Sequence, residues 1–267
     1  MKLFKPLFAL ITVIAIYSCS TVPLTGRRQL SLVSDDQINQ SAAQAYQQLL
    51  SDPQTKVVTG TSDAQRVKNI GAKLASAVER YLAQNGYADQ YKFTWEFNLI
   101  QSKEINAWCM PGGKVAVYSG LLPVAKNDAG IAVVMGHEIA HAIARHSAER
   151  MSQELAAQAG GAAVGAAVGG QSQTTQAVIG QLYGLGGQLT LLKYGRSQES
   201  EADRLGLTFM AMAGYDPNEA VAFWQRMSSS KDGAGAPPEF LSTHPSDATR
   251  IRDIQKYIPE AKKHFKK

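Results

Sequence analysis

The sequence has little of several features that mark large classes of protein. It has two cysteines in 267 residues, 18% charged residues and a formal net charge of +5. Two cysteines cannot form a disulfide framework. The small positive surplus, part of it in the C-terminal lysines, gives no support for binding to nucleic acid. With 45% apolar residues, the chain instead has the composition of a folded protein with a sizeable core.

The first residues predict export. Lys2 and Lys5 precede an apolar run at 7–16, which is short for a membrane span and fits the core of a secretory signal. The run ends in Tyr17-Ser18-Cys19, which resembles the end of a bacterial lipoprotein signal, where the cysteine is acylated. A plain signal peptide with an incidental cysteine is the alternative. No later segment is apolar for long enough to span a membrane.

We therefore expect three regions. Residues 1–18 are predicted to be a lipoprotein signal peptide, and residues 19–33 a polar tether held to the membrane by acyl chains on Cys19. Residues 34–267 are predicted to form the folded domain.

Helical patterns dominate that domain. Apolar residues recur at helical spacing after Ser34 and Thr61. Between the helical stretches, residues 92–99 alternate apolar and polar, and a second strand is expected at 114–118 after a Pro-Gly-Gly turn. The predicted fold class is α+β, mainly helical with a small antiparallel sheet.

One long stretch carries no charge. Between Glu154 and Lys193 there is no charged residue, and paired glycines interrupt small side chains. A loosely ordered helix pair with a connecting loop near the active site explains this pattern, and a hairpin that dips into a membrane is the alternative.

The chemistry is concentrated in the segment His137-Glu138-Ile139-Ala140-His141. On a helix, His137 and His141 lie one turn apart on the same face, which suits two ligands of a tetrahedral zinc site. Glu138 lies one step round, beside the water that zinc activates, where a carboxylate can act as general base. Two histidines on an ordinary buried helix are the alternative if no third ligand exists.

The position of a third ligand separates the types of metallopeptidase. A metzincin has glycine and histidine where this chain has Ala144 and Ser147, so that type is excluded. His146 lies nine residues from His137, about half a turn round a continuous helix. We therefore expect it to face away from the metal, at the surface or packed behind a ligand.

An acidic ligand on a later helix is the other possibility. Glu199 and Asp203 are four residues apart and share a helix face, whereas Glu201 points away. Glu199 is predicted to bind zinc, and Asp203 to accept the second N–H of a ligating histidine. The alternative is a solvated acidic face paired with Arg196 and Arg204.

With these residues in place, the chain resembles the gluzincin zinc metallopeptidases that include the HtpX-like and CAAX prenyl proteases. The likeness covers most of the chain after residue 19 and consists of several blocks in the same order. They are Thr25-Gly26-Arg27-Arg28-Gln29-Leu30, Asn106-Ala107, Pro111-Gly112-Gly113, Gly120-Leu121-Leu122, the His137–His141 core, Glu199 to Asp203, and Thr243-His244-Pro245-Ser246 with Arg250.

This resemblance implies a gluzincin domain with its sheet beside the HExxH helix, one Zn2+ per chain and internal cleavage of polypeptides. Because the spanning helices of the integral-membrane members are missing, the chain is most similar to soluble, lipid-anchored members of bacterial envelopes. Unfolded or misassembled envelope proteins are then the expected substrates. Prenylated substrates are not implied.

The resemblance also marks a region for substrate binding, at Asn106 and at Val115, Ala116 and Val117. The strand at 114–118 is expected to be an exposed edge that pairs with an extended substrate by main-chain hydrogen bonds.

The last block adds two candidates to the site. His244 is expected either to donate to the oxyanion or to act as a fourth zinc ligand that shuts the site, and Arg250 to orient Glu199 or Asp203. A helix cap with a surface histidine and arginine is the alternative. Cys109 is expected to be a small buried apolar residue.

The sequence thus predicts a zinc-dependent endopeptidase that acts in protein quality control. It is expected in the periplasm, anchored by lipid at the outer membrane. The alternative is an envelope chaperone or assembly lipoprotein with latent peptidase activity. No nucleic acid is expected as a partner, and the sequence does not indicate an oligomeric state.

Overall fold

The computed structural model describes residues 19–22, 25–161, 194–230, 239–244 and 248–265. The predicted signal peptide, most of the uncharged stretch and Ser246 lie outside the described residues. No helix within the described ranges is both long and apolar enough to cross a membrane. The longer helices are α2 (Asp35–Ser51), α3 (Ser62–Gln84), α5 (Asp128–Ile143), α6 (His146–Gly161), α8 (Arg196–Met212), α9 (Glu219–Ser229) and α11 (Ala248–Lys262). The short ones are α4 (Leu122–Ala125), α10 (Glu239–Thr243) and the 3-10 turns η1 (Ala88–Gln90) and η2 (Ser119–Leu121).

Three of the long helices begin at a side-chain cap, and two of these caps are the residues after which the sequence predicts a helix. Ser34 caps α2 by accepting from the N–H of Gln37, and Thr61 caps α3 in the same way. Asn127 caps α5, its side chain accepting from the N–H of Gly130 at 2.8 Å. The Asn127 cap fixes the start of the helix that carries the HExxH segment.

The main sheet has the strand order β3-β4-β6-β5. Its strands are β3 (Val57–Val58), β4 (Glu96–Ile100), β5 (Ala107–Met110) and β6 (Lys114–Tyr118). The predicted α+β class and the small sheet beside the HExxH helix are confirmed. Two of the pairings are antiparallel as expected, while β4 and β6 run parallel, so the sheet is mixed.

The predicted role of the strand at 114–118 as an exposed edge is wrong. β6 pairs with β4 on one side and with β5 on the other, so its main chain is already used. The turn before it explains the arrangement: Gly112 and Gly113 have φ of +79° and +87°, which lets the chain fold back on β5 as a tight hairpin. β5, a strand the sequence analysis did not predict, takes the edge position.

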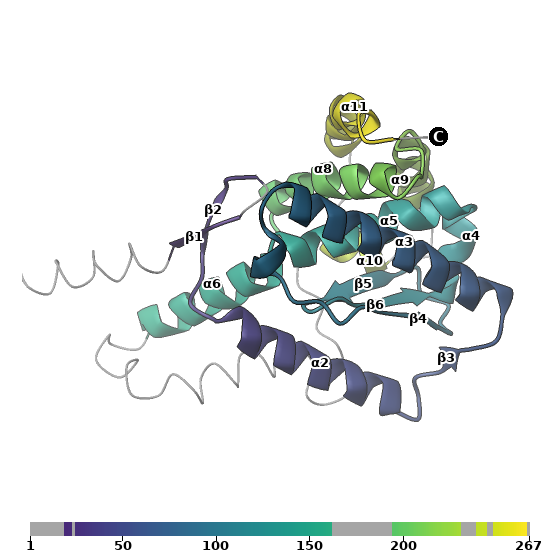
Figure 1. Ribbon diagram of the computed structural model, residues 1–267. Helices are drawn as coiled ribbons and strands as arrows, with labels where there is room; N and C mark the ends of the chain where they lie inside the picture. The colour runs from purple at the N-terminus through teal and green to yellow at the C-terminus, as the bar shows by residue number, and fades with distance from the viewer. Residues whose placement is uncertain (1–18, 23–24, 162–193, 231–238, 245–247, 266–267) are drawn as a thin grey trace, which may run out of the picture.

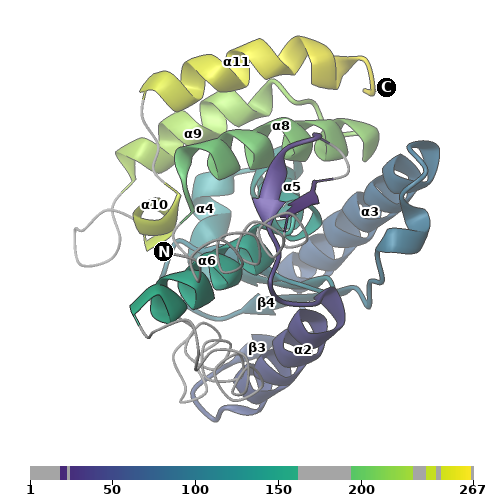
Figure 2. The ribbon, with the colours of Figure 1, turned by 90° about the vertical axis from the view of Figure 1, so that its left-hand side faces the viewer.

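Helices cover both faces of the sheet (Figure 1). Because side chains alternate along a strand, Val115 and Val117 of β6 pack with α3 and α5, whereas Ala116 packs with α2. Beyond α5 lie α8 and α9, with α11 outermost (Figures 1 and 2). The α5 helix is therefore enclosed between the sheet and the C-terminal helices.

The contact between α5 and α8 depends on two glycines. A Cβ at Gly206 would lie 2.9 Å from the backbone of both Gly136 and His137, and one at Gly136 would lie 3.0 Å from the Gly206 carbonyl oxygen. Only residues without a side chain allow so close an approach. It brings the acidic residues of α8 beside the histidines of α5.

The predicted tether is partly wrong as well. Strands β1 (Cys19–Thr21) and β2 (Arg28–Leu30) form an antiparallel hairpin, which lies in front of α5 and α8 in Figure 2. Val22 is fully buried in the main core, and the N–H of Leu32 donates to the hydroxyl of Ser152 in α6. Much of 19–33 is therefore part of the folded domain.

Candidate metal centre

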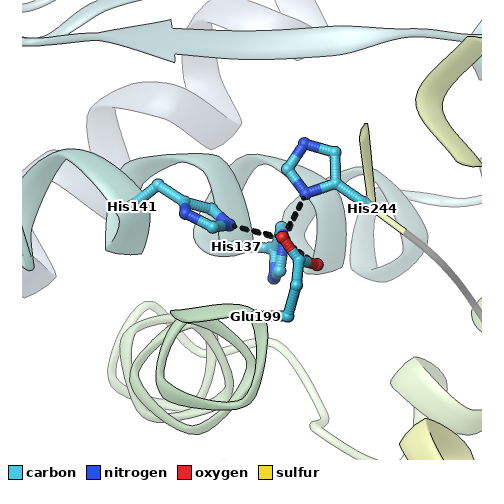
Figure 3. Close-up of side chains that lie close together, drawn as sticks. All are labelled: His137, His141, Glu199 and His244. Atoms are coloured by element: carbon cyan, nitrogen blue, oxygen red, sulfur yellow. Dashed lines mark hydrogen bonds and ion pairs between the residues drawn. The ribbon is translucent and has the colours of Figure 1, made fainter. Parts of the chain in front are cut away.

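Four buried side chains converge between α5, α8 and the end of α10. They are His137 and His141 of α5, Glu199 of α8 and His244, which directly follows α10. One potential ligand atom from each lies within 4.8 Å of all the others (Figure 3). The structure therefore brings together the two histidines and the glutamate that sequence spacing picked out, and adds His244.

The distances within this cluster fit a metal site. Nε2 of His141 lies 3.0 Å from Nε2 of His137 and 3.4 Å from Oε1 of Glu199. Nδ1 of His244 lies 2.9 Å from the same oxygen and 3.2 Å from His137 Nε2. Atoms bound to one zinc at about 2.0–2.1 Å in a tetrahedron stand about 3.3 Å apart. The side chains present can thus hold one Zn2+.

Glu138 lies beside the cluster with one carboxylate oxygen available. It is 3% exposed, and its Oε1 has no hydrogen-bond partner among the described residues, with Nε2 of His244 3.5 Å away. Burial raises the pKa of Glu138, although His244 and His137 act in the opposite direction. A buried carboxylate with an unpaired oxygen at the edge of a metal site suits a group that receives a proton.

Asp203 supports His137 as predicted. Its Oδ1 lies 2.9 Å from Nδ1 of His137, and Arg250 of α11 clamps both carboxylate oxygens at 2.8 and 2.9 Å. Burial acts to raise the pKa of Asp203, but Arg250 and His137 outweigh it and hold the pKa below its usual value. For His137, burial acts to lower the pKa. The contact with Asp203 has the larger effect and raises the pKa of His137 to about 9.

Arg250 orients both predicted acidic partners. Besides clamping Asp203, its Nη1 lies 2.9 Å from Oε2 of Glu199. The guanidinium stacks over the ring of Trp224, 3.5 Å from the ring centroid. The alternative of a surface arginine is therefore wrong, because Arg250 is 8% exposed. Trp224, expected to be core, is also the platform for this arginine.

His146 does not lie where a continuous helix would put it. The α5 helix ends at Ile143, and Arg145 has φ of +58°, so the chain changes direction before α6 begins at His146. His146 is fully buried, and its Nδ1 lies 2.8 Å from Nδ1 of His141. Of the two expected places, the surface is excluded, and His146 lies behind His141, a proposed ligand.

Glu201 is not part of a solvated face. It is 7% exposed, and its Oε2 lies 2.8 Å from Nε2 of His146. Burial acts to raise the pKa of Glu201, but His146, Thr25 and Arg27 outweigh it and lower it. Glu201 therefore points away from Glu199, as predicted, and the alternative of a solvated acidic face is wrong for it.

None of the four proposed substrate residues belongs to the four-residue cluster. Val115, Ala116 and Val117 are fully buried in the sheet interior and cannot bind a strand along their main chain. Asn106 is 2% exposed just before β5, where its Oδ1 accepts from the N–H of Ala107. Its place beside the edge strand keeps it a candidate.

Two neighbours complete the site. Tyr194, which the sequence analysis did not single out, stacks on His141 with 4.0 Å between ring centroids. Cys109 on β5 is buried as expected, and burial raises the pKa of its thiol, which makes it unreactive.

Comparisons with known proteins agree with this geometry. The model of the family described as Peptidase family M48 matches residues 66–258. The chain is 33% identical to the mitochondrial metalloendopeptidase OMA1 of Schizosaccharomyces pombe over 240 residues, which cover 90% of this chain and 66% of that protein. It is 30% identical to mitochondrial metalloendopeptidase OMA1 of Bos taurus over 270 residues, covering 98% of this chain and 51% of the relative.

A bacterial protein is similar as well. The beta-barrel assembly-enhancing protease of Escherichia coli K12 is 28% identical over 194 residues, which cover 72% of this chain and 38% of that protein. The chain thus spans less than two thirds of the length of each of these three relatives.

Proposed function

The chain belongs to peptidase family M48, and on that premise we propose that it is a zinc-dependent endopeptidase. The observation that carries this proposal is the cluster of His137, His141 and Glu199 with Glu138 beside it. Three ligands and an adjacent buried carboxylate are the set that hydrolytic zinc sites use. A closed structural zinc site would give Glu138 no purpose.

The roles of the residues follow from their positions. Zinc held here would supply Lewis acidity, which polarises a carbonyl and acidifies water. Glu138 takes a proton from the attacking water as the new C–O bond forms. It then passes that proton to the amine nitrogen as the C–N bond breaks. Asp203 and Arg250 hold His137 and Glu199 in place during both steps.

His244 is proposed to be a displaceable fourth ligand. Its Nδ1 lies among the other ligand atoms, at 2.9 Å from Glu199 and 3.2 Å from His137. In that position it would exclude water or substrate from the metal. Donation to the oxyanion is the other role that remains open, and it requires the ring to move.

The substrate is proposed to pair with β5. Because the N–H of Tyr118 donates to the carbonyl of Asn106, alternate residues of β5 face β6. The main chain of Cys109 and the carbonyl of Ala107 then face the other edge, while the N–H of Ala107 donates to the side chain of Asn106. Pairing by main chain favours extended segments of any sequence. Unfolded or misassembled proteins supply such segments.

The bacterial envelope is the proposed location, with acyl chains on Cys19 as the anchor. Support comes from the Lys2–Cys19 pattern and from the similarity to a protein named for β-barrel assembly. The mitochondrial names of other relatives give no support for a bacterial envelope. An assembly factor with latent peptidase activity is the second candidate, favoured by the position of His244.

Replacement of Glu138 tests the function. Because Glu138 is not in the ligand cluster, Glu138→Gln should fold and keep one zinc per chain. Its rate of casein cleavage should fall at least about a hundredfold, as expected when a general base is lost. Zinc content by elemental analysis and casein turnover measure the two effects.

Glu104→Gln is the matched control, since Glu104 is exposed. It should cleave casein at the wild-type rate. If Glu138→Gln cleaves as fast as Glu104→Gln, the proposed peptidase function is wrong. If wild type binds zinc but never cleaves casein or another unfolded protein, the assembly factor is favoured instead.

A further inference from the structure

A chain of polar contacts leads from the metal cluster to the N-terminal hairpin. His141 uses Nε2 within the cluster, and its other nitrogen, Nδ1, lies 2.8 Å from Nδ1 of His146. His146 uses its own Nε2 to reach Oε2 of Glu201 at 2.8 Å. His146 is 0% exposed and Glu201 is 7% exposed, so both are buried.

The hairpin holds the far end of this chain. Nε of Arg27 lies 2.6 Å from Oε2 of Glu201, and the hydroxyl of Thr25 donates to Oε1 of the same carboxylate. Arg27 also reaches Glu149 of α6, with two nitrogens at 2.8 and 2.9 Å. One arginine of the hairpin therefore joins α6 and α8 behind the metal cluster.

The protons along this path have only one consistent arrangement. A ligating His141 carries its proton on Nδ1, so this N–H donates to Nδ1 of His146. His146 must then carry its proton on Nε2, which donates to Glu201. Glu201 is left a buried carboxylate, and such a charge needs a cation and donors around it. Arg27 and Thr25 supply them.

We propose that Arg27, with Thr25, is a positioning residue for the metal centre. It fixes the carboxylate of Glu201, which fixes the ring of His146 and through it the orientation of His141. This inference rests on the proposed function in one respect, that His141 binds the metal. It gives the Thr25–Arg27 segment a role in metal affinity and not only in attaching the hairpin.

Zinc affinity of the full-length protein, measured by competition with a chelator, tests the proposal. Arg27→Ala should weaken zinc binding about fivefold to tenfold. His146→Ala should weaken it about tenfold to a hundredfold, which is the usual effect of removing the hydrogen-bond partner of a metal ligand. Arg28→Ala is the matched control, because Arg28 is the exposed neighbour that directly follows Arg27 in the sequence. It should bind zinc within about twofold of wild type.

Two further variants separate positioning from general loosening of the hairpin. Glu149→Gln removes the charge of the second carboxylate that Arg27 contacts but lies off the path. It should therefore lower the melting temperature of the metal-free protein and leave zinc affinity near wild type. In the His146→Ala background the path is already broken. Adding Arg27→Ala there should change zinc affinity less than about twofold.

The outcomes are decisive for the inference. It is overturned if Arg27→Ala binds zinc as tightly as Arg28→Ala, if Glu149→Gln weakens zinc as much as Arg27→Ala, or if the losses of Arg27→Ala and His146→Ala simply add. Arg27→Lys, which keeps the charge, should recover part of the affinity and guards against misfolding of the alanine variant. Failure of wild type to bind zinc would instead reject the proposed function.

Discussion

The two histidines of the HExxH helix are supported by different regions of the molecule. Behind His137, one carboxylate makes direct contact: Asp203 at 2.9 Å, clamped by Arg250. Behind His141, the carboxylate acts through a second imidazole, that of His146, and is held by Arg27. The first support is built from the C-terminal helices, and the second depends on the N-terminal hairpin.

The difference shows that one site can depend both on spacing within a single helix and on contacts between distant segments. Asp203 stands one helical turn from Glu199, so α8 alone supplies both a proposed ligand and the acceptor behind another. The support of His141 joins residues 174 positions apart, Arg27 and Glu201. We expect the short, direct support to control metal affinity more strongly than the long one.

The largest effect is expected at Glu199, which contacts both histidines. Glu199→Ala removes a proposed ligand, and the zinc content of the dialysed protein should fall from about one per chain to below about a tenth. Elemental analysis measures this, with the exposed Glu104→Ala as control. Full occupancy in Glu199→Ala would mean that the metal is held by other residues.

The direct support is expected to come second. Asp203→Ala should weaken zinc binding about tenfold to a hundredfold, because His137 loses its acceptor and Arg250 keeps a buried charge with one partner fewer. Chelator competition measures the change. A loss below about threefold would show that Asp203 holds Arg250 in the fold without tuning the metal.

The longer support is expected to come third. Glu201→Ala should weaken zinc binding about tenfold or less, because Glu201 acts on His141 only through His146. Stacking on Tyr194 still helps to orient the His141 ring in this variant. The same competition assay gives the ranking directly. A larger loss in Glu201→Ala than in Asp203→Ala would reverse the comparison and make the hairpin side dominant.

Sequence reasoning succeeded where one element sets the geometry. The HExxH spacing and the four-residue separation of Glu199 and Asp203 are fixed by the helical repeat, and the structure has these side chains facing one another. The caps of α2, α3 and α5 are likewise local signals. The α+β class followed from the change of period alone.

It failed where the answer depends on distant parts of the chain. The place of β6 in the sheet is set by pairing with β4 and β5, which no pattern within 114–118 reveals. The place of His146 follows from a helix end at Ile143 and a positive φ at Arg145. A positive φ is usually marked by glycine, so an arginine at this position gave no indication of the turn. The pairing of Arg27 with Glu201 is invisible in either segment alone.

His244 extends the comparison to a proposed ligand with weaker support. His137 and His141 each use their second ring nitrogen to contact a buried partner. Nε2 of His244 lies 3.5 Å from Oε1 of Glu138, a longer contact than those behind His137 and His141, and its ring stacks on Phe240, with 4.4 Å between centroids. A ring with only this longer contact at its outer nitrogen is the one most easily displaced from the cluster.

We therefore expect His244→Ala to raise casein turnover about threefold to tenfold at unchanged zinc content. If the ring covers the metal as proposed, removing it increases the fraction of molecules open to substrate, and the rate rises by the inverse of the former open fraction. An oxyanion donor would give the opposite sign, a fall of about a hundredfold at full zinc occupancy. An unchanged rate would reject both roles.

His244→Phe, which keeps a ring but has no ligand nitrogen, separates coverage of the metal from coordination. Its casein turnover should match that of His244→Ala if the bond to zinc restrains the enzyme, and match wild type if the bulk of the ring alone does.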